Sequence, residues 1–331
     1  NVMGAACLVT DNIIFSKTEY TAYTILETRM HIDLRTLELF CAVAEELSIT
    51  LSAQRLGRAP SNVTTRIQQL EKELDVSLFL RHSKRLHLSP EGDQFLAYAK
   101  KILAIAEEAR QVLHPNTPAG SLRIGSMEST AASRLPPVLA EYHRHWPDVK
   151  IELTTGPSRP MLESLQARMV DCAFVAPLFG TGEDTSSVLS SMGLVGQPVF
   201  KEELMLILPE GHPPVVSASD VSVSSLVAFR QGCTYRAIAE NWFREAVDNE
   251  SAFSNVQEVG SYHAMIACVS AGTSASVIPR SVLGLLNEPP HIQQIPLTAI
   301  YTWLVWREGY ETPALKELLK TLSVSSSPEG H

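Results

Sequence analysis

Residues 60–74 are mostly polar, yet their large aliphatic side chains recur at a helical spacing. These side chains are Val63, Ile67, Leu70 and Leu74. Their spacing places them on one face of a helix, so that face must pack against other elements while the opposite face stays in water. Pro60 suits the first helical turn, where a missing N–H costs nothing. The segment therefore requires a small helical unit around it.

Two more helices are predicted just before this one. Apolar residues from Leu34 to Leu47 recur at a helical spacing. Thr50 is expected to be the N-cap of a short second helix that ends near Gly57. Three short helices with a tight middle connection form a helix-turn-helix unit. The β-prone residues around HSKR, residues 82–85, then predict a short hairpin, or wing.

A long helix and an α/β region follow the wing. Residues 91–114 carry an apolar stripe, and PNTPAG, residues 115–120, has the composition of a hinge. Strand-like runs then alternate with helical stretches, which predicts α/β lobes with largely parallel sheets. The predicted strands are 121–126, 149–156, 172–177, 204–209, 225–229, 274–279 and 301–306, and the predicted helices are 133–145, 159–169, 235–248, 262–271 and 312–322.

At 331 residues, the chain is long enough for two or three domains. The expected parts are a poorly ordered extension (1–30, with Met30 as a candidate native start), a winged helix-turn-helix domain (31–90), the long helix (91–114), the hinge (115–120), the α/β domain (121–323) and a tail (324–331). Within the α/β domain we expect one lobe from residues 121–195 and 298–323, and a second lobe from residues 196–297.

Positive charge gathers around the helix at residues 60–74. The chain carries a net −9, but Ser48–Pro90 holds seven Arg and Lys against three acids, a local +4 that leaves −13 for the rest. Such a patch binds phosphate locally on an otherwise acidic protein. The helix also presents hydroxyl and amide groups, which can approach base edges in the major groove of DNA. A plain solvent-facing helix is the alternative, but Lys and Glu would suit that role better.

These observations predict contacts to double-stranded DNA. The residues expected to contact bases are Ser61, Asn62, Thr64, Thr65 and Gln68. The residues expected to contact phosphates are Thr50, Arg55, Arg58, Arg66, Lys72, Arg81, Lys84 and Arg85.

The segment from Asp33 to Gly92 resembles the amino-terminal domain of LysR-type transcriptional regulators. The matching positions are Leu37, Phe40, Ser48, Thr50, Ala53, Leu56, Val63, Ile67, Leu70, Glu71, Leu78, Phe79, Arg81 and Gly92. The chain departs from the common pattern at Ala59, Thr65 and Asp75, where relatives often carry Ser, Arg and Gly. The change at Thr65 suggests an operator preference that differs from that of the commonest members.

The resemblance extends over roughly residues 31–322 and implies the rest of the architecture. It implies a promoter-binding regulator in which residues 91–113 pair with their twin in a homodimer or homotetramer. The apolar stripe of that helix supports pairing independently, although packing onto its own domain remains an alternative. The resemblance also implies a two-lobed α/β domain, similar to a periplasmic binding protein, that holds a small-molecule effector between its lobes.

Loops that lead from strands into helices are the candidate effector site. The candidate residues are Ser126, Met127, Glu128, Ser129, Ala176, Pro177, Cys233, Thr234, Arg236, Tyr262 and His263. We expect the effector to be an amino acid or another carboxylate, with Arg236 binding the carboxylate and Glu128 an amine. Ordinary helix capping uses the same residue types, so a single loop would not indicate a binding site, whereas several such loops together do.

Other protein classes fit less well. We find no GxSxG, HExxH, Walker or GxGxxG motif, so neither an enzyme nor a bound cofactor or metal is expected. The five scattered cysteines favour the reducing cytoplasm. No apolar run is long enough to span a membrane, so no membrane partner is expected. Two alternatives stay open. A solute-binding protein leaves residues 34–113 unexplained, and a redox sensor would depend on Cys233, with Cys268 as a partner if the fold permits.

Overall fold

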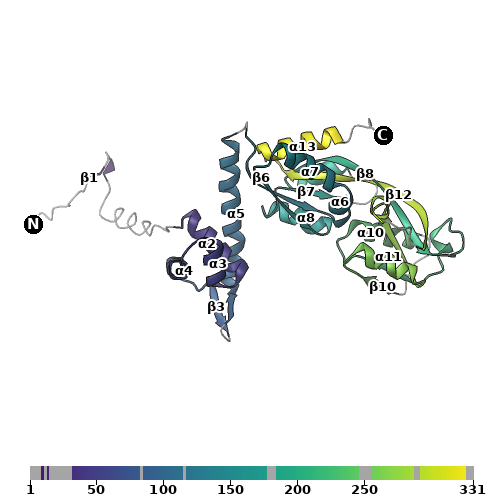
Figure 1. The fold of residues 1–331 in the computed structure, drawn as a ribbon, viewed down its shortest axis with the longest axis horizontal. Helices are drawn as coiled ribbons and strands as arrows, with labels where there is room; N and C mark the ends of the chain where they lie inside the picture. The colour runs from purple at the N-terminus through teal and green to yellow at the C-terminus, as the bar shows by residue number, and fades with distance from the viewer. Residues whose placement is uncertain are drawn as a thin grey trace, which may run out of the picture. The chain divides into compact units, whose positions relative to one another are not determined.

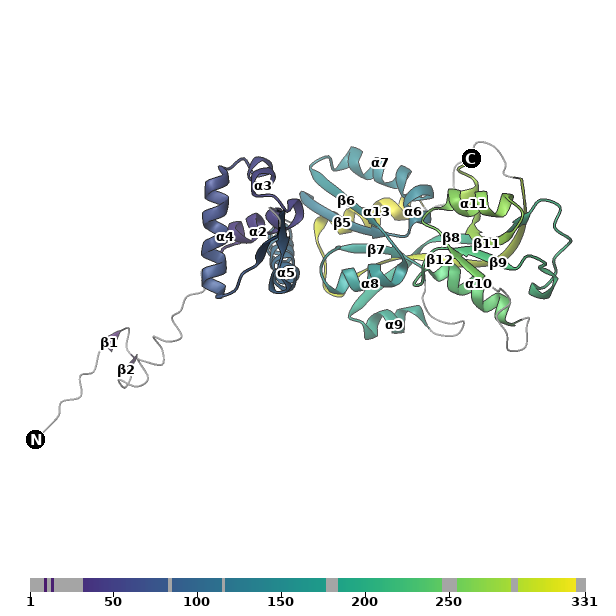
Figure 2. The same cartoon turned by 90° about the horizontal axis from the view of Figure 1, so that it is seen from below.

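The computed structural model describes residues 9–10, 13–14, 32–82, 85–114, 117–176, 184–245, 255–286 and 291–325. The chain divides into two compact units, Asn1–Leu103 and Ala104–His331 (Figures 1 and 2). Near the start, β1 (Val9–Thr10) and β2 (Ile13–Ile14) pair antiparallel. Within the described ranges, no helix combines the length and the apolar character that a membrane crossing requires.

The first unit is a bundle of short helices with a hairpin. Its elements are α2 (Leu34–Glu46), α3 (Ile49–Arg55), α4 (Pro60–Leu74), β3 (Phe79–His82), β4 (Arg85–Leu88) and the beginning of α5 (Pro90–Val112). Val63, Ile67 and Leu70 are buried as the spacing predicts. The ring of Phe40 lies 5.5 Å from that of Phe79 and 5.1 Å from that of Phe95, which ties α2 to the hairpin and to α5.

Helix ends in this unit follow local chemistry. Asp33 caps α2 by accepting the N–H of Thr36 at 2.7 Å. The expectation that Thr50 caps α3 is wrong: α3 begins at Ile49, and Ser48 accepts the N–H of Leu51 at 3.3 Å. Ser48 is the residue with extended backbone angles, as an N-cap requires, whereas Thr50 already lies inside the helix.

The two ends of α4 match their sequence signals. Pro60 occupies the first turn after Ala59, which makes no side-chain cap. Asp75 closes the helix in the left-handed conformation, with φ of 53°. Its short polar side chain thus takes a position that often belongs to glycine.

The second unit alternates strands and helices around one eight-stranded sheet. Its strands are β5 (Gly120–Ser126), β6 (Val149–Thr155), β7 (Cys172–Val175), β8 (Leu194–Pro209), β9 (Ser225–Ala228), β10 (Asn255–Glu258), β11 (Ser274–Pro279) and β12 (Ile292–Arg307). Its helices are α6 (Glu128–Ser133), α7 (Leu135–His145), α8 (Ser158–Gln166), α9 (Thr185–Ser191), η1 (Ala218–Asp220), α10 (Thr234–Glu245), α11 (Tyr262–Ser270), α12 (Arg280–Leu283) and α13 (Pro313–Ser325). The strand order is β10-β9-β11-β8-β12-β7-β5-β6.

Two long strands join the lobes. β8 and β12 pair antiparallel along their length, and both expected lobe boundaries, at 195/196 and 297/298, fall within them. The expectation of largely parallel sheets is therefore corrected to a mixed sheet. β5 pairs parallel with β6 and β7, and β9 with β10 and β11, but the central pairings β8–β12, β8–β11 and β7–β12 are antiparallel.

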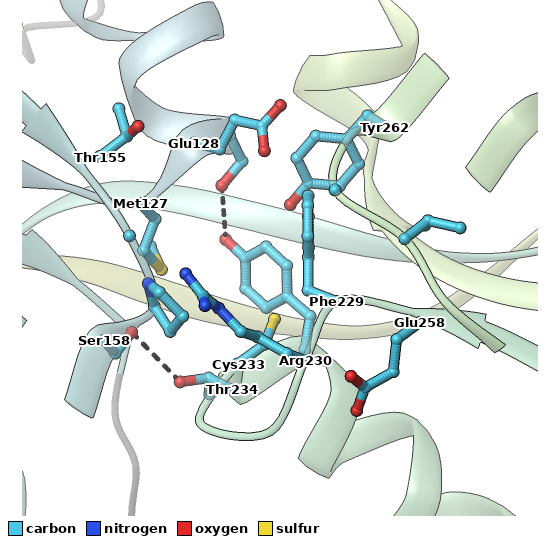
Figure 3. Close-up of a pocket in the computed structure, with 16 residues that line it drawn as sticks. Met127, Glu128, Thr155, Ser158, Phe229, Arg230, Cys233, Thr234, Glu258 and Tyr262 are labelled. Atoms are coloured by element: carbon cyan, nitrogen blue, oxygen red, sulfur yellow. Dashed lines mark hydrogen bonds between the residues drawn. The ribbon is translucent and has the colours of Figure 1, made fainter. Parts of the chain in front are cut away.

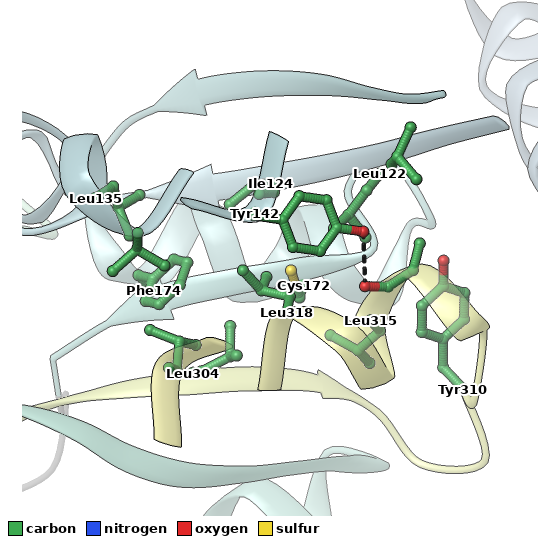
Figure 4. Close-up of a cluster of buried hydrophobic side chains, with 14 residues drawn as sticks. Leu122, Ile124, Leu135, Tyr142, Cys172, Phe174, Leu304, Tyr310, Leu315 and Leu318 are labelled. Atoms are coloured by element: carbon green, nitrogen blue, oxygen red, sulfur yellow. Dashed lines mark hydrogen bonds between the residues drawn. The ribbon is translucent and has the colours of Figure 1, made fainter. Parts of the chain in front are cut away.

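Each lobe has its own core. In the first lobe, the buried ring of Tyr142 on α7 packs with Leu122, Phe174 and Leu318, and its hydroxyl donates to the carbonyl of Ala314 at 3.0 Å (Figure 4). A separate cluster in the second lobe surrounds β8, β9 and α10. The sheet thus runs through two packed bodies, and the loops between them can form a cleft.

A partly buried charge cluster, with Asp171 and Arg307 at its centre, joins the end of α5 to the first lobe. The carboxylate of Asp171 accepts from the Arg123 guanidinium at 2.6 Å and lies 3.7 Å from that of Arg307. Glu108 of α5 pairs with Arg168 at 2.5 Å and lies 3.8 Å from Arg307. Buried charges are tolerated when they are paired and hydrogen-bonded, so this cluster gives the end of α5 a defined attachment to the lobe.

Candidate DNA-reading helix and effector pocket

The polar face of α4 is open to solvent. Ser61, Asn62, Thr65 and Gln68 are exposed on it. Thr64 is half-buried, and its hydroxyl donates to the carbonyl of Pro60 at 3.0 Å. The hydroxyl oxygen of Thr64 can still accept a hydrogen bond, because a back-bonded hydroxyl keeps acceptor capacity.

Most of the predicted phosphate-binding side chains are also exposed. They are Thr50, Arg58, Arg66, Lys72, Arg81 and Arg85. Lys84 lies outside the described residues. Arg55 is already engaged with the carboxylates of Glu45 and Glu46, at 2.9 and 3.0 Å. Its charge is thus partly neutralised, which makes it the weakest of the predicted phosphate contacts.

The candidate effector pocket is a cavity of about 450 Å³ between the lobes of the second unit (Figure 3). Its wall comes from four loops, those after β5 and β6 in the first lobe and those after β9 and β10 in the second. The lining residues are Met127, Glu128, Ser129, Thr155, Gly156, Pro157, Ser158, Phe229, Arg230, Cys233, Thr234, Tyr235, Glu258, Val259, Gly260 and Tyr262. The carboxyl ends of parallel strands are where α/β proteins usually bind ligands, and the volume suits a small molecule.

Three charged side chains line the pocket. Glu128 opens α6, Arg230 follows β9, and Glu258 ends β10. Glu258 pairs with Arg236 at 2.6 Å. Among the described residues, no ion pair involves Glu128 or Arg230. Burial raises the pKa of the Glu128 carboxyl, and the nearby positive potential of His263 opposes that rise in part.

Hydroxyl groups form a polar floor that crosses between the lobes. Ser129 of the first lobe donates to the hydroxyl of Tyr235 in the second at 3.5 Å, and Tyr262 points toward the same place (Figure 3). Thr234 donates to the Ser158 hydroxyl at 3.3 Å, also across the lobes. These groups can bind carboxylate or carbonyl oxygens, because hydroxyl hydrogens rotate to suit a ligand.

The structure brings together six of the predicted effector residues. These are Met127, Glu128, Ser129, Cys233, Thr234 and Tyr262. Ser126 and Ala176 are buried behind the wall, where Ser126 donates to the carbonyl of Met127 and Ala176 donates its N–H to Ser158. His263 is exposed beside the pocket without lining it. Pro177 lies outside the described residues.

A carboxylate bound in this pocket could not reach Arg236. Its guanidinium pairs with Glu240 at 2.7 Å and with Glu258 at 2.6 Å, and it donates to the carbonyl of Phe229. The side chain is buried against β10 and does not line the cavity. The expected role of Arg236 is therefore corrected, and Arg230 is the arginine that faces the pocket (Figure 3).

The sequence prediction missed the loop after β6 and parts of the loops after β9 and β10. The missed lining residues are residues 155–158, Phe229, Arg230, Tyr235 and residues 258–260. The segment TTGPS, residues 154–158, also leads from a predicted strand, 149–156, to a predicted helix, 159–169. The rule that selected the other loops would therefore have selected this one as well.

The cysteines are free thiols in the described part of the chain. Cys41 and Cys172 are buried, and Cys233 and Cys268 are half-buried. Burial raises the pKa of the Cys233 thiol, and this disfavours the reactive thiolate. The redox-sensor alternative thus gains no support from the surroundings of Cys233. Within the described residues, no cluster of three His, Cys, Asp or Glu side chains could hold a metal ion.

A winged helix-turn-helix unit joined to a two-lobed domain with a pocket defines a class of protein, the ligand-responsive DNA-binding regulators. The chain belongs to the LysR family of these regulators. Residues 34–93 match the model of the bacterial regulatory helix-turn-helix protein, lysR family, and residues 115–324 match the LysR substrate binding domain. The chain is therefore a LysR-type transcriptional regulator, as the resemblance implied, and this family is one of regulators that are generally not enzymes.

Relatives cover nearly the whole chain. The transcriptional regulator GltR of Bacillus subtilis (strain 168) is 34% identical over 294 residues, which are 87% of this chain and 95% of GltR. The regulator SoxR of Arthrobacter sp. (strain TE1826) is 30% identical over 303 residues, 90% of this chain and 98% of SoxR.

Solved structures share the fold. A full-length OxyR variant from Pseudomonas aeruginosa has a TM-score of 0.65 at 20% identity, covering 91% of this chain and 99% of its own. Full-length CbnR in complex with its target DNA has a TM-score of 0.63 at 21% identity, covering 89% of this chain and all of its own. These likenesses confirm the predicted fold class.

Proposed function

We propose that this regulator responds to a small organic carboxylate, which Arg230 binds in the pocket between the lobes. The observation that carries the proposal is an exposed guanidinium that faces the pocket and, among the described residues, takes part in no ion pair. Arginine binds carboxylates through two parallel hydrogen bonds, and the Ser158 and Thr234 hydroxyls can add further contacts. A ligand that contacts both lobes would favour the closed arrangement of the domain and so shift the regulator between states.

On the DNA side, we propose that α4 reads bases in the major groove. The proposed base contacts are Ser61, Asn62, Thr64, Thr65 and Gln68, and the proposed phosphate contacts are Thr50, Arg58, Arg66, Lys72, Arg81, Lys84 and Arg85, with a minor part for Arg55. The exposure of this polar face supports these roles. Such a regulator acts where promoter DNA is found, so we place it in the cytoplasm.

We further propose that the regulator is a homodimer, or a tetramer built from dimers, held by α5. Tyr98, Ile102, Ile105 and Val112 are exposed at a helical spacing on this helix. A stripe of this kind is stabilised when a second copy covers it. Two copies of α4 would then reach two half-sites, and this bivalent contact would raise affinity without any new contact.

The test of the effector proposal uses the full-length chain and a panel of small carboxylates, with thermal unfolding and isothermal titration calorimetry as readouts. Arg230→Gln should weaken carboxylate binding roughly ten- to a hundredfold, because charge-assisted hydrogen bonds contribute about 1.5–3 kcal/mol. Arg244→Gln is the matched control, since Arg244 is an exposed arginine in the last turn of α10 and lies outside the pocket lining. An equal loss of carboxylate affinity in Arg230→Gln and in Arg244→Gln would contradict the proposal.

The DNA proposal is tested by mobility shift on operator variants. Thr64→Ala and Gln68→Ala should reduce the preference among operators, whereas Lys72→Ala should weaken binding to all sequences and lower its salt dependence. If all three variants lower the affinity for every operator by a similar factor, α4 does not read bases.

A further inference from the structure

Two opposite charges face one pocket from different lobes. Glu128 belongs to the first lobe and Arg230 to the second, and both line the same cavity. Figure 3 shows Glu128 and Arg230 extending from elements of different lobes, with Glu128 on α6 and Arg230 just beyond β9. They do not approach each other within ion-pair distance, and the described residues offer neither of them another ion pair.

The absence of pairing sets these two side chains apart from their neighbours. Glu258, the third charged residue of the pocket, pairs with Arg236 at 2.6 Å. Close by, Arg134 pairs with the buried carboxylate of Glu202, also at 2.6 Å. Where charges around the cleft serve the fold, the structure thus gives them partners.

The carboxyl group of Glu128 is partly withdrawn from water. The residue is half-buried at the first position of α6, and burial raises the pKa of its carboxyl group. The nearby His263 opposes this rise in part, and its side chain is exposed. A desolvated carboxylate in a ligand pocket is stabilised by a cation, and perturbed acids of this kind tend to mark binding or catalytic sites.

Apolar and hydroxyl-bearing side chains line the pocket beside the two charges. Met127, Pro157, Phe229 and Val259 contribute apolar wall, while the hydroxyls of Ser129 and Tyr235 lie on the floor. A ligand that contacts this wall and both charges therefore needs an apolar body with two charged groups. One group is cationic and faces Glu128, and the other is anionic and faces Arg230.

We propose that the effector is zwitterionic: its ammonium or similar cationic group binds Glu128 in the first lobe, and its carboxylate binds Arg230 in the second. This inference rests on the proposed carboxylate site and adds the second charge. One molecule then joins the lobes through two ion pairs. A ligand with only one of the charges leaves the other protein group desolvated and unpaired when the lobes close, which costs free energy.

The test uses four probes of matched chain length: valerate, 2-aminovalerate, 5-aminovalerate and pentylamine. Binding to the full-length protein is measured by calorimetry and by thermal shift, for the wild type, Glu128→Gln and Arg230→Gln. Glu163→Gln is the matched control, an exposed carboxylate of α8 that does not line the pocket. In the wild type and in this control, at least one aminovalerate should bind about tenfold or more tightly than valerate.

Glu128→Gln should abolish that preference and leave valerate binding equal or improved, because the variant keeps the shape of the side chain and removes its charge. Arg230→Gln should weaken binding of valerate and both aminovalerates. Two outcomes separate the two proposals. If valerate binds through Arg230 but neither amine adds affinity, or Glu128→Gln keeps the preference, the zwitterion proposal is overturned and the carboxylate site stands. If none of the three carboxylates binds, the carboxylate site itself is overturned.

Discussion

The carboxylate of Glu71, near the end of α4, accepts the backbone N–H of Leu78 at 2.8 Å, just before the wing begins. The same oxygen accepts the N–H of Phe79, the first residue of β3, at 3.1 Å. One side chain of the proposed reading helix therefore holds the start of the hairpin that carries Arg81 and Arg85. This contact links the element proposed to read bases to the element proposed to hold phosphates.

Glu71→Ala should loosen the wing. It leaves two backbone N–H groups without their shared acceptor oxygen. Because a hydrogen bond to a charged group contributes about 1.5–3 kcal/mol and one oxygen serves both donors, we expect the free energy of unfolding to fall by about 2–3 kcal/mol. DNA affinity should fall for all sequences alike. Urea unfolding followed by circular dichroism measures the first effect and mobility shift the second. Glu73→Ala, at an exposed position of the same turn, is the control and should change little.

Charges placed on the exposed stripe of α5 should separate the protomers. Ile102→Glu and Ile105→Glu would put carboxylates into the proposed dimer interface. Each isoleucine side chain that is buried there is expected to stabilise the dimer by about 1.5–3 kcal/mol. Sedimentation velocity should show a dimer that dissociates at least tenfold more readily. Ala97→Glu, exposed beside the stripe, should have less effect. An unchanged oligomer in both isoleucine variants would show that α5 does not hold it.

Asp171→Ala should destabilise the second unit strongly. Its carboxylate is 3% exposed and neutralises Arg123 beside the buried Arg307. Removing one partner of a buried ion pair costs about 3–5 kcal/mol, because the other charge stays desolvated. All four tryptophans lie beyond residue 140, so their fluorescence reports the unfolding of this unit. The control is Glu152→Gln, which breaks an exposed pair with Lys150 and should cost at most about 1 kcal/mol.

Acid should weaken the cap of α2. The N–H of Thr36 donates to Asp33 and holds the pKa of its carboxyl below the ordinary value of 3.8. A lowered pKa means that the stabilising contribution is complete above 3.8 and is lost as the pH falls through the lower, folded-state value. Asp33→Asn keeps an acceptor but does not titrate. The difference in urea midpoint between wild type and variant should therefore change below pH 3.8 and stay constant above it.

Alkylating reagents should react slowly with Cys41 and Cys233 in the folded protein. Burial raises the pKa of Cys41 to about 11 and also raises that of Cys233, so little thiolate exists at neutral pH. Iodoacetamide labelling at about neutral pH, followed by mass spectrometry, should modify both faster once urea unfolds the chain. Rapid alkylation of Cys233 in the folded state would revive the redox-sensor alternative.

Local patterns predicted much of this fold because helix formation depends on neighbours in sequence. The aliphatic spacing from Val63 to Leu70 identified the buried face of α4, and Pro60 identified its first turn. The helix from Tyr262 to Ser270 and the strand from Ser274 to Pro279 also lie where the sequence placed them. The position of a cap depends on one or two residues, and the N-cap of α3 is Ser48 where Thr50 was expected.

Pairings between distant segments required the tertiary structure. The antiparallel union of β8 and β12 brings together residues about a hundred positions apart, and no local spacing encodes that direction. The two arginines near α10 show the same limit. Glu240 is one turn away from Arg236, but Glu258 lies on β10, and together they draw this guanidinium away from the pocket.

The sequence by itself therefore determined the family, the helix-turn-helix unit with its candidate reading helix, and the kind of loop that forms the pocket, because each is a short-range pattern of residue types. The tertiary structure decided that Arg230, and not Arg236, faces the cavity, and that Glu128 faces it from the other lobe. The physical reason is that a charged side chain turns toward its strongest partner, and that partner is set by the packing of strands and helices far apart in the chain.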